Sequence, residues 1–141
     1  MSNPSDYKRL MRGVIPYATV EGVDKAIEFY TRAFGAVVMG QIVRSDDGRV
    51  LNASIAINDG IVMVMDPFPE HGSSPSSGSN FLLQLIIADG DLWWDRAVGA
   101  GCEVLSPFKL EFWGDRFGRV RDPFGLEWAF NEPAIEKQQA G

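Results

Sequence analysis

The chain has 141 residues, of which 45% are hydrophobic and 23% charged, a balance typical of a water-soluble globular domain. Its formal net charge of -6 disfavours phosphate backbones and anionic membrane surfaces, so we expect no nucleic acid and no membrane partner. A single cysteine, Cys102, excludes a disulfide framework and a Cys-based zinc site. No segment has the pattern of a signal peptide or a membrane span, and a cytoplasmic location is therefore expected.

The first half of the chain predicts a polar arm, one strand, one helix and three further strands. Residues 1–12 form the polar arm. Between Val23 and Phe34 apolar residues recur at helical spacing, and Gly35 supplies the helix stop. Pro16 favours an edge position or a bulge in the first strand, because it has no backbone N–H to donate. The predicted strands are 13–20, 36–44, 50–57 and 61–66.

Residues 67–80 are rich in Ser, Pro and Gly and predict a linker. The pattern then starts again with a helix at 89–101 that ends at a glycine. The strands predicted around it are 81–88, 102–108, 117–121 and 126–130. The two modules therefore span 13–66 and 81–133, and a polar tail, 134–141, follows them.

The two halves match in order and in spacing. Gly60 follows Gly35 by 25 residues, and Gly125 follows Gly101 by 24. With these glycines matched, "NDGIVMVM" aligns with "DPFGLEWAF". A repeat of this kind predicts an α+β fold built from two βαβββ modules. Each module alone would leave one sheet face uncovered, so we expect the two to share a core.

Two stretches, "AIEFYTRAFGA" and "WGDRFGRVRDPFGLEWAF", resemble the vicinal oxygen chelate superfamily of glyoxalases, bleomycin-resistance proteins and extradiol dioxygenases. The resemblance covers roughly residues 13–133 and is closest to the PhnB-like branch. It implies that the modules curl into an open, U-shaped barrel. It also implies a homodimer in which the modules pair or exchange strands between chains.

The resemblance also implies where a divalent metal would be held, and those positions cannot hold one. They fall on Ile15, Val64, Leu82 and Ala129, all aliphatic, and their immediate neighbours are no usual metal ligands either. We therefore expect no metal and no other cofactor. The one histidine, His71, lies in the linker, where Asp66 and Glu70 leave a loose cation site as an alternative.

Strand alternation assigns the pocket walls. If Ala129 faces the pocket, so do Glu127, Gln84 and Tyr17, together with Thr19 and Val62, whereas Trp128 and Phe130 pack under a helix. Apolar walls with a few orienting polar groups are typical of ligand sites. The predicted ligand-binding residues are Tyr17, Gln84, Trp113, Arg116 and Glu127.

Several of these residues have structural alternatives. Glu127 would bind a ligand or pair with Arg119 or Arg121, and it is the one candidate for a catalytic general base. Trp113 would cover the pocket or pack at a dimer interface. Arg116 would bind an anionic group of a ligand, or brace a loop carbonyl or a carboxylate. The "DPFG" motif is interpreted as a structural turn.

The sequence favours a metal-free protein that binds a small apolar or aromatic molecule. A metal-dependent lyase, isomerase or dioxygenase of the same superfamily is the first alternative, and whether any reaction is catalysed stays open. A dimeric interaction protein that uses only the fold is the second alternative.

Overall fold

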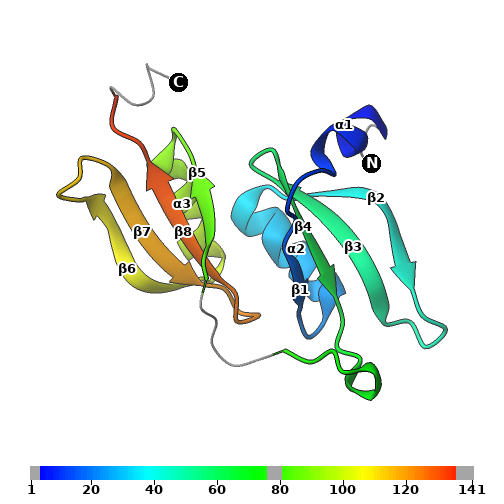
Figure 1. The fold of residues 1–141 in the computed structure, drawn as a ribbon. Helices are drawn as coiled ribbons and strands as arrows, with labels where there is room; N and C mark the ends of the chain where they lie inside the picture. Colours follow the sequence, from blue (N-terminus) through cyan, green and yellow to red (C-terminus); the bar gives the residue numbers. More distant parts are fainter. Residues whose placement is uncertain (1–3, 76–80, 136–141) are drawn as a thin grey trace. The chain divides into compact units, whose positions relative to one another are not determined.

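The computed structural model describes residues 4–75 and 81–135 (Figure 1). The chain forms two compact units, Met1–Ser77 and Gly78–Gly141, here called unit 1 and unit 2. Each unit contains one four-stranded sheet and a helix that follows the first strand of that sheet. Within the described ranges, no helix is long and apolar enough to cross a membrane.

Unit 1 has the strand order β1-β4-β3-β2, in which β1 runs parallel to β4 and the other neighbours are antiparallel. The predicted edge position of the first strand is confirmed. The elements are α1 (Pro4–Leu10), β1 (Tyr17–Thr19), α2 (Val23–Phe34), β2 (Val37–Arg44), β3 (Val50–Ile57), β4 (Gly60–Met65) and a 3-10 helix (Pro69–His71).

Unit 2 repeats this topology with the order β5-β8-β7-β6 and one parallel pair, β5 with β8. Its elements are β5 (Leu83–Ile86), α3 (Gly90–Ala100), β6 (Glu103–Leu110), β7 (Arg116–Arg121) and β8 (Glu127–Glu132). The predicted α+β fold of two βαβββ modules is confirmed. Each sheet is open and has two edge strands, so the barrel and the homodimer remain predictions.

The element boundaries differ from the prediction at several places. The predicted polar arm contains α1, whose Tyr7 ring lies against Gly40: a Cβ at Gly40 would be 3.2 Å from Tyr7 Cε2. The last strand continues through Asn131 and Glu132, because these residues pair with Phe117 and Arg116. The parts of the predicted arm, linker and tail at 1–3, 76–80 and 136–141 lie outside the described residues.

The predicted helix ends are confirmed. Gly35 and Gly101 follow α2 and α3 in the left-handed conformation, with φ values of 66° and 119°. Glycine adopts this conformation without the steric cost of a Cβ. The apolar stripe of α2 is buried as the spacing predicted, through Val23, Ala26, Phe29, Tyr30, Ala33 and Phe34.

Each sheet has one face packed on its helix, the helix face, and an opposite face, the far face. In unit 2, Trp94 of α3 makes an edge contact with Phe130, with ring centroids 5.6 Å apart, and Gly118 pairs with Phe130 across the strands. Trp128 and Phe130 therefore lie on the helix face, as predicted. Ala129 and Glu127 alternate with them and lie on the far face.

In unit 1, the prediction for Val62 is wrong. Asp66 follows β4 and reaches the start of α2, so Val64 and Val62, two and four residues before it, share the helix face. The pairing of Tyr17 with Met63 and of Thr19 with Met65 places those four residues on the far face. Tyr17, Thr19 and Gln84 thus have the faces that were predicted for them.

The prediction for Val62 is wrong because the last strands of the two repeats correspond with a shift of one residue. The backbone N–H of Val20 donates to Met65, and the equivalent N–H of Ile87 donates to Asn131. Met63 is therefore the structural equivalent of Ala129. The turn between β3 and β4 is made by Asn58 and Asp59, both at positive φ. The turn at 123–125 has one residue more than this turn. An alignment of Gly60 with Gly125 hides the extra residue.

Candidate functional site

The last strand of each sheet holds the start of its helix through a carboxylate. In unit 1, Asp66 Oδ1 accepts hydrogen bonds from the backbone N–H groups of Gly22 and Val23 at 3.1 and 2.9 Å. In unit 2, Glu132 Oε1 accepts from the N–H of Gly90 at 2.7 Å. Both carboxylates satisfy N–H groups that have no partner within the helix. Their role is structural.

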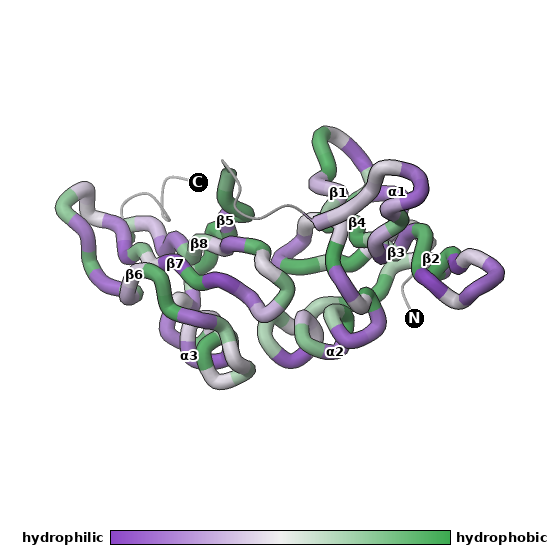
Figure 2. The backbone as a smooth tube through the Cα atoms, turned by 90° about the horizontal axis from the view of Figure 1, so that it is seen from below, coloured by the Kyte–Doolittle hydropathy of each residue, from purple (hydrophilic) through white to green (hydrophobic). Residues whose placement is uncertain are grey.

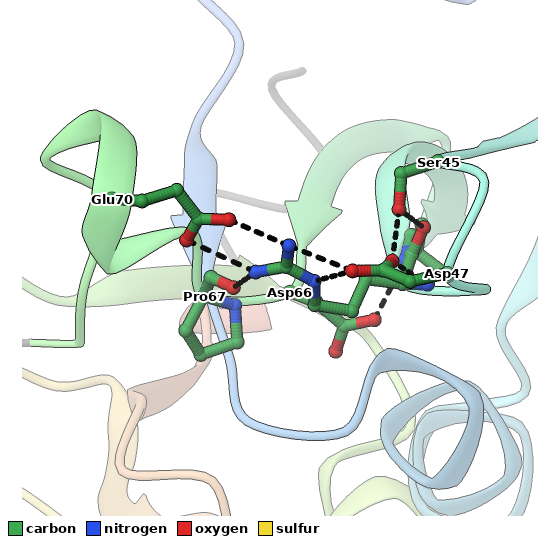
Figure 3. A network of polar contacts seen from close by, with 7 residues as sticks. Ser45, Asp47, Asp66, Pro67 and Glu70 are labelled. Atoms are coloured by element: carbon green, nitrogen blue, oxygen red, sulfur yellow. Dashed lines mark hydrogen bonds and ion pairs between the residues drawn. The ribbon is translucent and has the colours of Figure 1, made fainter.

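A second cluster joins the carboxylates of Asp47 and Glu70, both labelled in Figure 3, to the guanidinium of Arg49. Its Nε donates to Asp47 at 2.9 Å, its Nη2 to Glu70 at 2.6 Å and its Nη1 to the carbonyl of Pro67 at 3.1 Å. The guanidinium also lies 4.0 Å from the centre of the Phe68 ring. Arg49 therefore fastens the segment after β4 to the β2–β3 turn.

A hollow of about 450 Å³ opens beside this cluster. Its apolar part is formed by Leu51, Met65 and Phe68, and its rim carries Asp46 and His71 among other polar residues. Met65 belongs to the far face of the sheet. This combination of apolar walls and a polar rim suits a small organic ligand.

Replacing Glu70 with glutamine should reduce the pH dependence of stability. The hydrogen bond from Arg49 lowers the pKa of Glu70 to about 2 from its ordinary 4.5. The carboxylate therefore stabilises the fold fully above about pH 4.5, and this contribution is lost as the pH falls through about 2. We expect Glu70→Gln to unfold at lower urea concentration than the parent at pH 7, with a gap that shrinks below pH 4.5.

The control for this prediction is Glu28→Gln, an exposed carboxylate on α2. The Glu70 effect is expected to be small, because the side chain is 48% exposed, and smaller still in high salt. A gap between Glu70→Gln and the parent that stays constant from pH 7 to pH 3 would show that the ion pair contributes nothing.

The far face of unit 1 is mostly apolar. Met63 and Met65 lie next to Tyr17 and Thr19 on the neighbouring strand. The hydroxyl of Tyr17 donates to the carbonyl of Leu51 at 2.8 Å, and burial raises the pKa of the phenol. Tyr17 thus presents its ring beside two methionines, while its hydroxyl is engaged within the unit.

The far face of unit 2 is polar by comparison. Figure 2, which colours whole residues and does not separate the two faces, shows β4 mostly in green and parts of β7 in purple. Arg119 Nη2 donates to Glu127 Oε1 at 3.0 Å, and Arg121 Nη2 lies 3.6 Å from Glu127 Oε2. The structure therefore contains the ion pair that was the alternative for Glu127. Its ligand-binding and general-base roles remain predictions.

Trp113 and Arg116 lie at the end of the β6–β7 hairpin. Trp113 is 42% exposed and contacts the ring edges of Phe112 and Phe117. Arg116 bonds Asp91 at 2.6 Å and Glu132 at 3.4 Å. The contacts of Arg116 are those of the bracing alternative, and they hold it on the helix side of the sheet.

The "DPFG" turn is structural, as interpreted. Asp122 Oδ1 accepts from the N–H groups of Phe124 and Leu126 at 2.8 and 3.0 Å, and Oδ2 accepts from Trp128 Nε1 at 2.8 Å. Cys102 is buried, and burial together with Asp122 raises the pKa of its thiol to about 12. A thiol with that pKa is a poor nucleophile at neutral pH.

The residues at the family's metal positions do not fit a metal. Ile15 and Leu82 precede β1 and β5 at equivalent places, and Ala129 is on the far face. Because Met63 is the equivalent of Ala129, it replaces Val64 in this set. Its thioether is a soft ligand that suits none of the hard divalent cations.

The loose cation site around His71 also lacks free ligands. Asp66 accepts three backbone N–H groups, including that of Val50 at 2.7 Å, and Glu70 is paired with Arg49. Among the described residues, no three His, Cys, Asp or Glu side chains are grouped to hold a metal ion.

The sequence did not predict the apolar walls of the hollow, whereas the pairing of Glu127 with Arg119 or Arg121 was one of its alternatives. In the sequence, Leu51 and Phe68 are ordinary apolar residues far apart along the chain. Only the fold of the segment after β4 brings them together. The alternation of Arg119 and Arg121 in "FGRVRD" supports the pairing of Glu127, since both side chains point to the same face of a strand.

Comparisons with known proteins agree with this architecture. A sequence profile of the Glyoxalase/Bleomycin resistance protein/Dioxygenase superfamily matches residues 14–130. The Mycobacterium bovis protein Mb0911c is 35% identical over 127 residues, which cover 86% of this chain and 83% of that protein. The chain therefore belongs to the glyoxalase/bleomycin resistance protein/dioxygenase superfamily.

Two solved structures illustrate the shared fold. TioX from Micromonospora sp. ML1 is 25% identical and has a TM-score of 0.65, over 86% of this chain and 98% of TioX. The fosfomycin resistance protein FosX from Listeria monocytogenes is 15% identical and has a TM-score of 0.68, over 92% and 99% of the two chains. At 15% identity FosX shows the fold alone.

Proposed function

We propose that this protein binds a small apolar or aromatic molecule without a protein-bound metal, as a member of the glyoxalase/bleomycin-resistance type. The observation that carries the proposal is the chemistry of the family's metal positions. The side chains of Ile15, Met63, Leu82 and Ala129 offer no nitrogen or oxygen ligand to a metal ion.

The hollow beside Met65 supports this proposal. It is large enough for a small organic molecule, and Leu51, Met65 and Phe68 give it apolar walls. We also propose a second copy of the chain as partner. Exposed apolar side chains on the edge strands favour this, namely Val37 and Val43 on β2 and Val104 and Leu110 on β6.

Titration with 2-naphthamide, a neutral aromatic probe, tests the binding proposal. We expect saturable binding by calorimetry and about a tenfold weaker affinity for Met65→Lys, because a charge then lies among the apolar contacts. Leu92→Lys is the matched control. Leu92 is 63% exposed on α3, away from the edge strands, and is not among the residues that line the hollow.

Equal affinities for the parent, Met65→Lys and Leu92→Lys would count against the hollow as the site. A parent that fails to bind this probe and a panel of flat aromatic compounds would count against the proposed function. Thermal melts of the three proteins verify that the substitutions leave the fold intact.

A further inference from the structure

The hollow beside Met65 carries an excess of negative charge. All the residues that line it belong to unit 1, so its lining does not depend on unit 2. Three carboxylates and one guanidinium are among them, which leaves two negative charges in excess when His71 is neutral. The charged residues are Asp46, Asp47, Glu70 and Arg49. A concave site lined by one sign of charge attracts ligands of the opposite sign.

The guanidinium of Arg49 has no donor left for an anionic ligand. Its Nε donates to Asp47 at 2.9 Å, and its Nη2 also lies 2.8 Å from that carboxylate. Nη2 and Nη1 donate to the two oxygens of Glu70 at 2.6 and 3.2 Å, and Nη1 donates to the Pro67 carbonyl as well. The face of the guanidinium lies over the Phe68 ring. An anion could reach Arg49 only by displacing one of these partners.

The carboxylate of Asp46, in contrast, is available to a ligand. Asp46 lies in the turn between β2 and β3, where the N–H of Gly48 donates to the Ser45 carbonyl at 3.0 Å and the N–H of Ser45 donates to the Arg49 carbonyl at 2.8 Å. These bonds fix the rim of the hollow. Within residues 4–75 and 81–135, the Asp46 side chain is exposed and has no hydrogen bond or ion pair.

We propose that the hollow binds a ligand with a cationic nitrogen group, an ammonium or an amidinium, which donates to Asp46 at the rim. This inference rests on the proposed function and names the chemical class of its ligand. The aromatic or apolar body of the ligand lies against Met65 and Phe68 in the hollow. Hydrogen bonds between a cationic donor and a carboxylate are stronger than neutral ones, and a thioether makes favourable contacts with aromatic rings.

The test compares three probes of nearly the same size and shape that differ in charge: 2-naphthamidine is a cation, 2-naphthamide is neutral and 2-naphthoate is an anion. By calorimetry on the parent we expect 2-naphthamidine to bind about tenfold more tightly than 2-naphthoate, with 2-naphthamide between them. This ratio should fall at high salt, because the rim is open to solvent.

Two variants locate the charge that causes the preference. Asp46→Asn should reduce the ratio to about threefold, since Asp47 and Glu70 are already paired. Asp59→Asn is the matched control: it removes the same charge from a side chain that is 87% exposed, in the turn at the other end of β3, and should keep the ratio. Nuclear Overhauser contacts from the naphthalene ring of 2-naphthamidine to the Met65 methyl group should place the ring in the hollow.

Three results would overturn the inference: equal affinities for the cation and the anion, tighter binding of the anion, or a preference for the cation that is unchanged in Asp46→Asn. Binding of 2-naphthamide without any preference for the cation overturns the inference and leaves the proposed function standing. Failure of all three probes to bind overturns the inference and counts against the proposed function as well.

Discussion

Replacing Asp122 with alanine should cost about 3 kcal/mol of unfolding free energy and lower the Tm by on the order of 10 °C. The carboxylate is 3% exposed and accepts three hydrogen bonds, from two backbone N–H groups and from the indole of Trp128. Alanine leaves these donors without an acceptor in a buried place. Trp128 itself is only 1% exposed, so water cannot readily replace the lost oxygen.

Asp122→Asn separates the contribution of the two backbone hydrogen bonds from that of the hydrogen bond to the Trp128 indole. Its carbonyl oxygen can still accept from Phe124 and Leu126, but its amino group would face the indole N–H of Trp128. We therefore expect a loss of about 1–2 kcal/mol, measured by urea unfolding. Asp91→Ala is the control, because this carboxylate is 76% exposed and its ion pair is expected to contribute little. An unchanged midpoint for Asp122→Ala would contradict the structural role of the turn.

Two glycine-to-alanine changes in unit 2 should have opposite signs. A Cβ at Gly118 would lie 2.7 Å from Trp94 Cζ3 and 2.8 and 2.9 Å from the Cα and N of Phe108. The neighbouring strand cannot move aside at low cost, so Gly118→Ala should lose about 1–3 kcal/mol. At Gly99, within α3, nothing lies within 4 Å of the added methyl group.

Gly99→Ala should therefore stabilise the protein by about 0.5–1 kcal/mol, because alanine loses less backbone entropy in a helix. Thermal and urea unfolding of both variants give the comparison. A stabilised Gly118→Ala would show that β6 and β7 are not packed as closely as the structure has them.

Much of the fold could be predicted from the sequence, because its signals are local. The helical spacing from Val23 to Phe34, the glycine stops and the repeat of strands all follow from neighbouring residues. The seven-residue helix α1 was missed, because its contact with Gly40 lies far away along the chain. Isolated helices of this length are not stable on their own.

The one-residue shift between the repeats has a similar cause. An alignment of Gly60 with Gly125 matches the two repeats in overall spacing. It does not reveal how many residues form the turn of each hairpin. Hydrogen bonds between strands decide the register, and they show that Met63 rather than Val64 corresponds to Ala129. A shift of one residue moves a side chain to the other face of the sheet.

The site could be predicted only as a set of alternatives. The sequence placed Glu127, Arg119 and Arg121 on adjacent strands but did not decide whether the carboxylate pairs with an arginine or with a ligand. The structure shows the pair, and it shows that Arg119 retains an unused buried N–H. That property depends on distances between strands, which a sequence does not contain.

The most direct test of the account is the metal content of the protein purified without an affinity tag, followed by calorimetric titration with Zn²⁺, Mn²⁺, Ni²⁺ and Fe²⁺. We predict no stoichiometric metal and no tight binding, since Ile15, Met63, Leu82 and Ala129 cannot coordinate these ions. About one metal per chain, bound tightly, would contradict the proposal and would direct the search for ligands to Gln84, Glu111, Glu127 and His71.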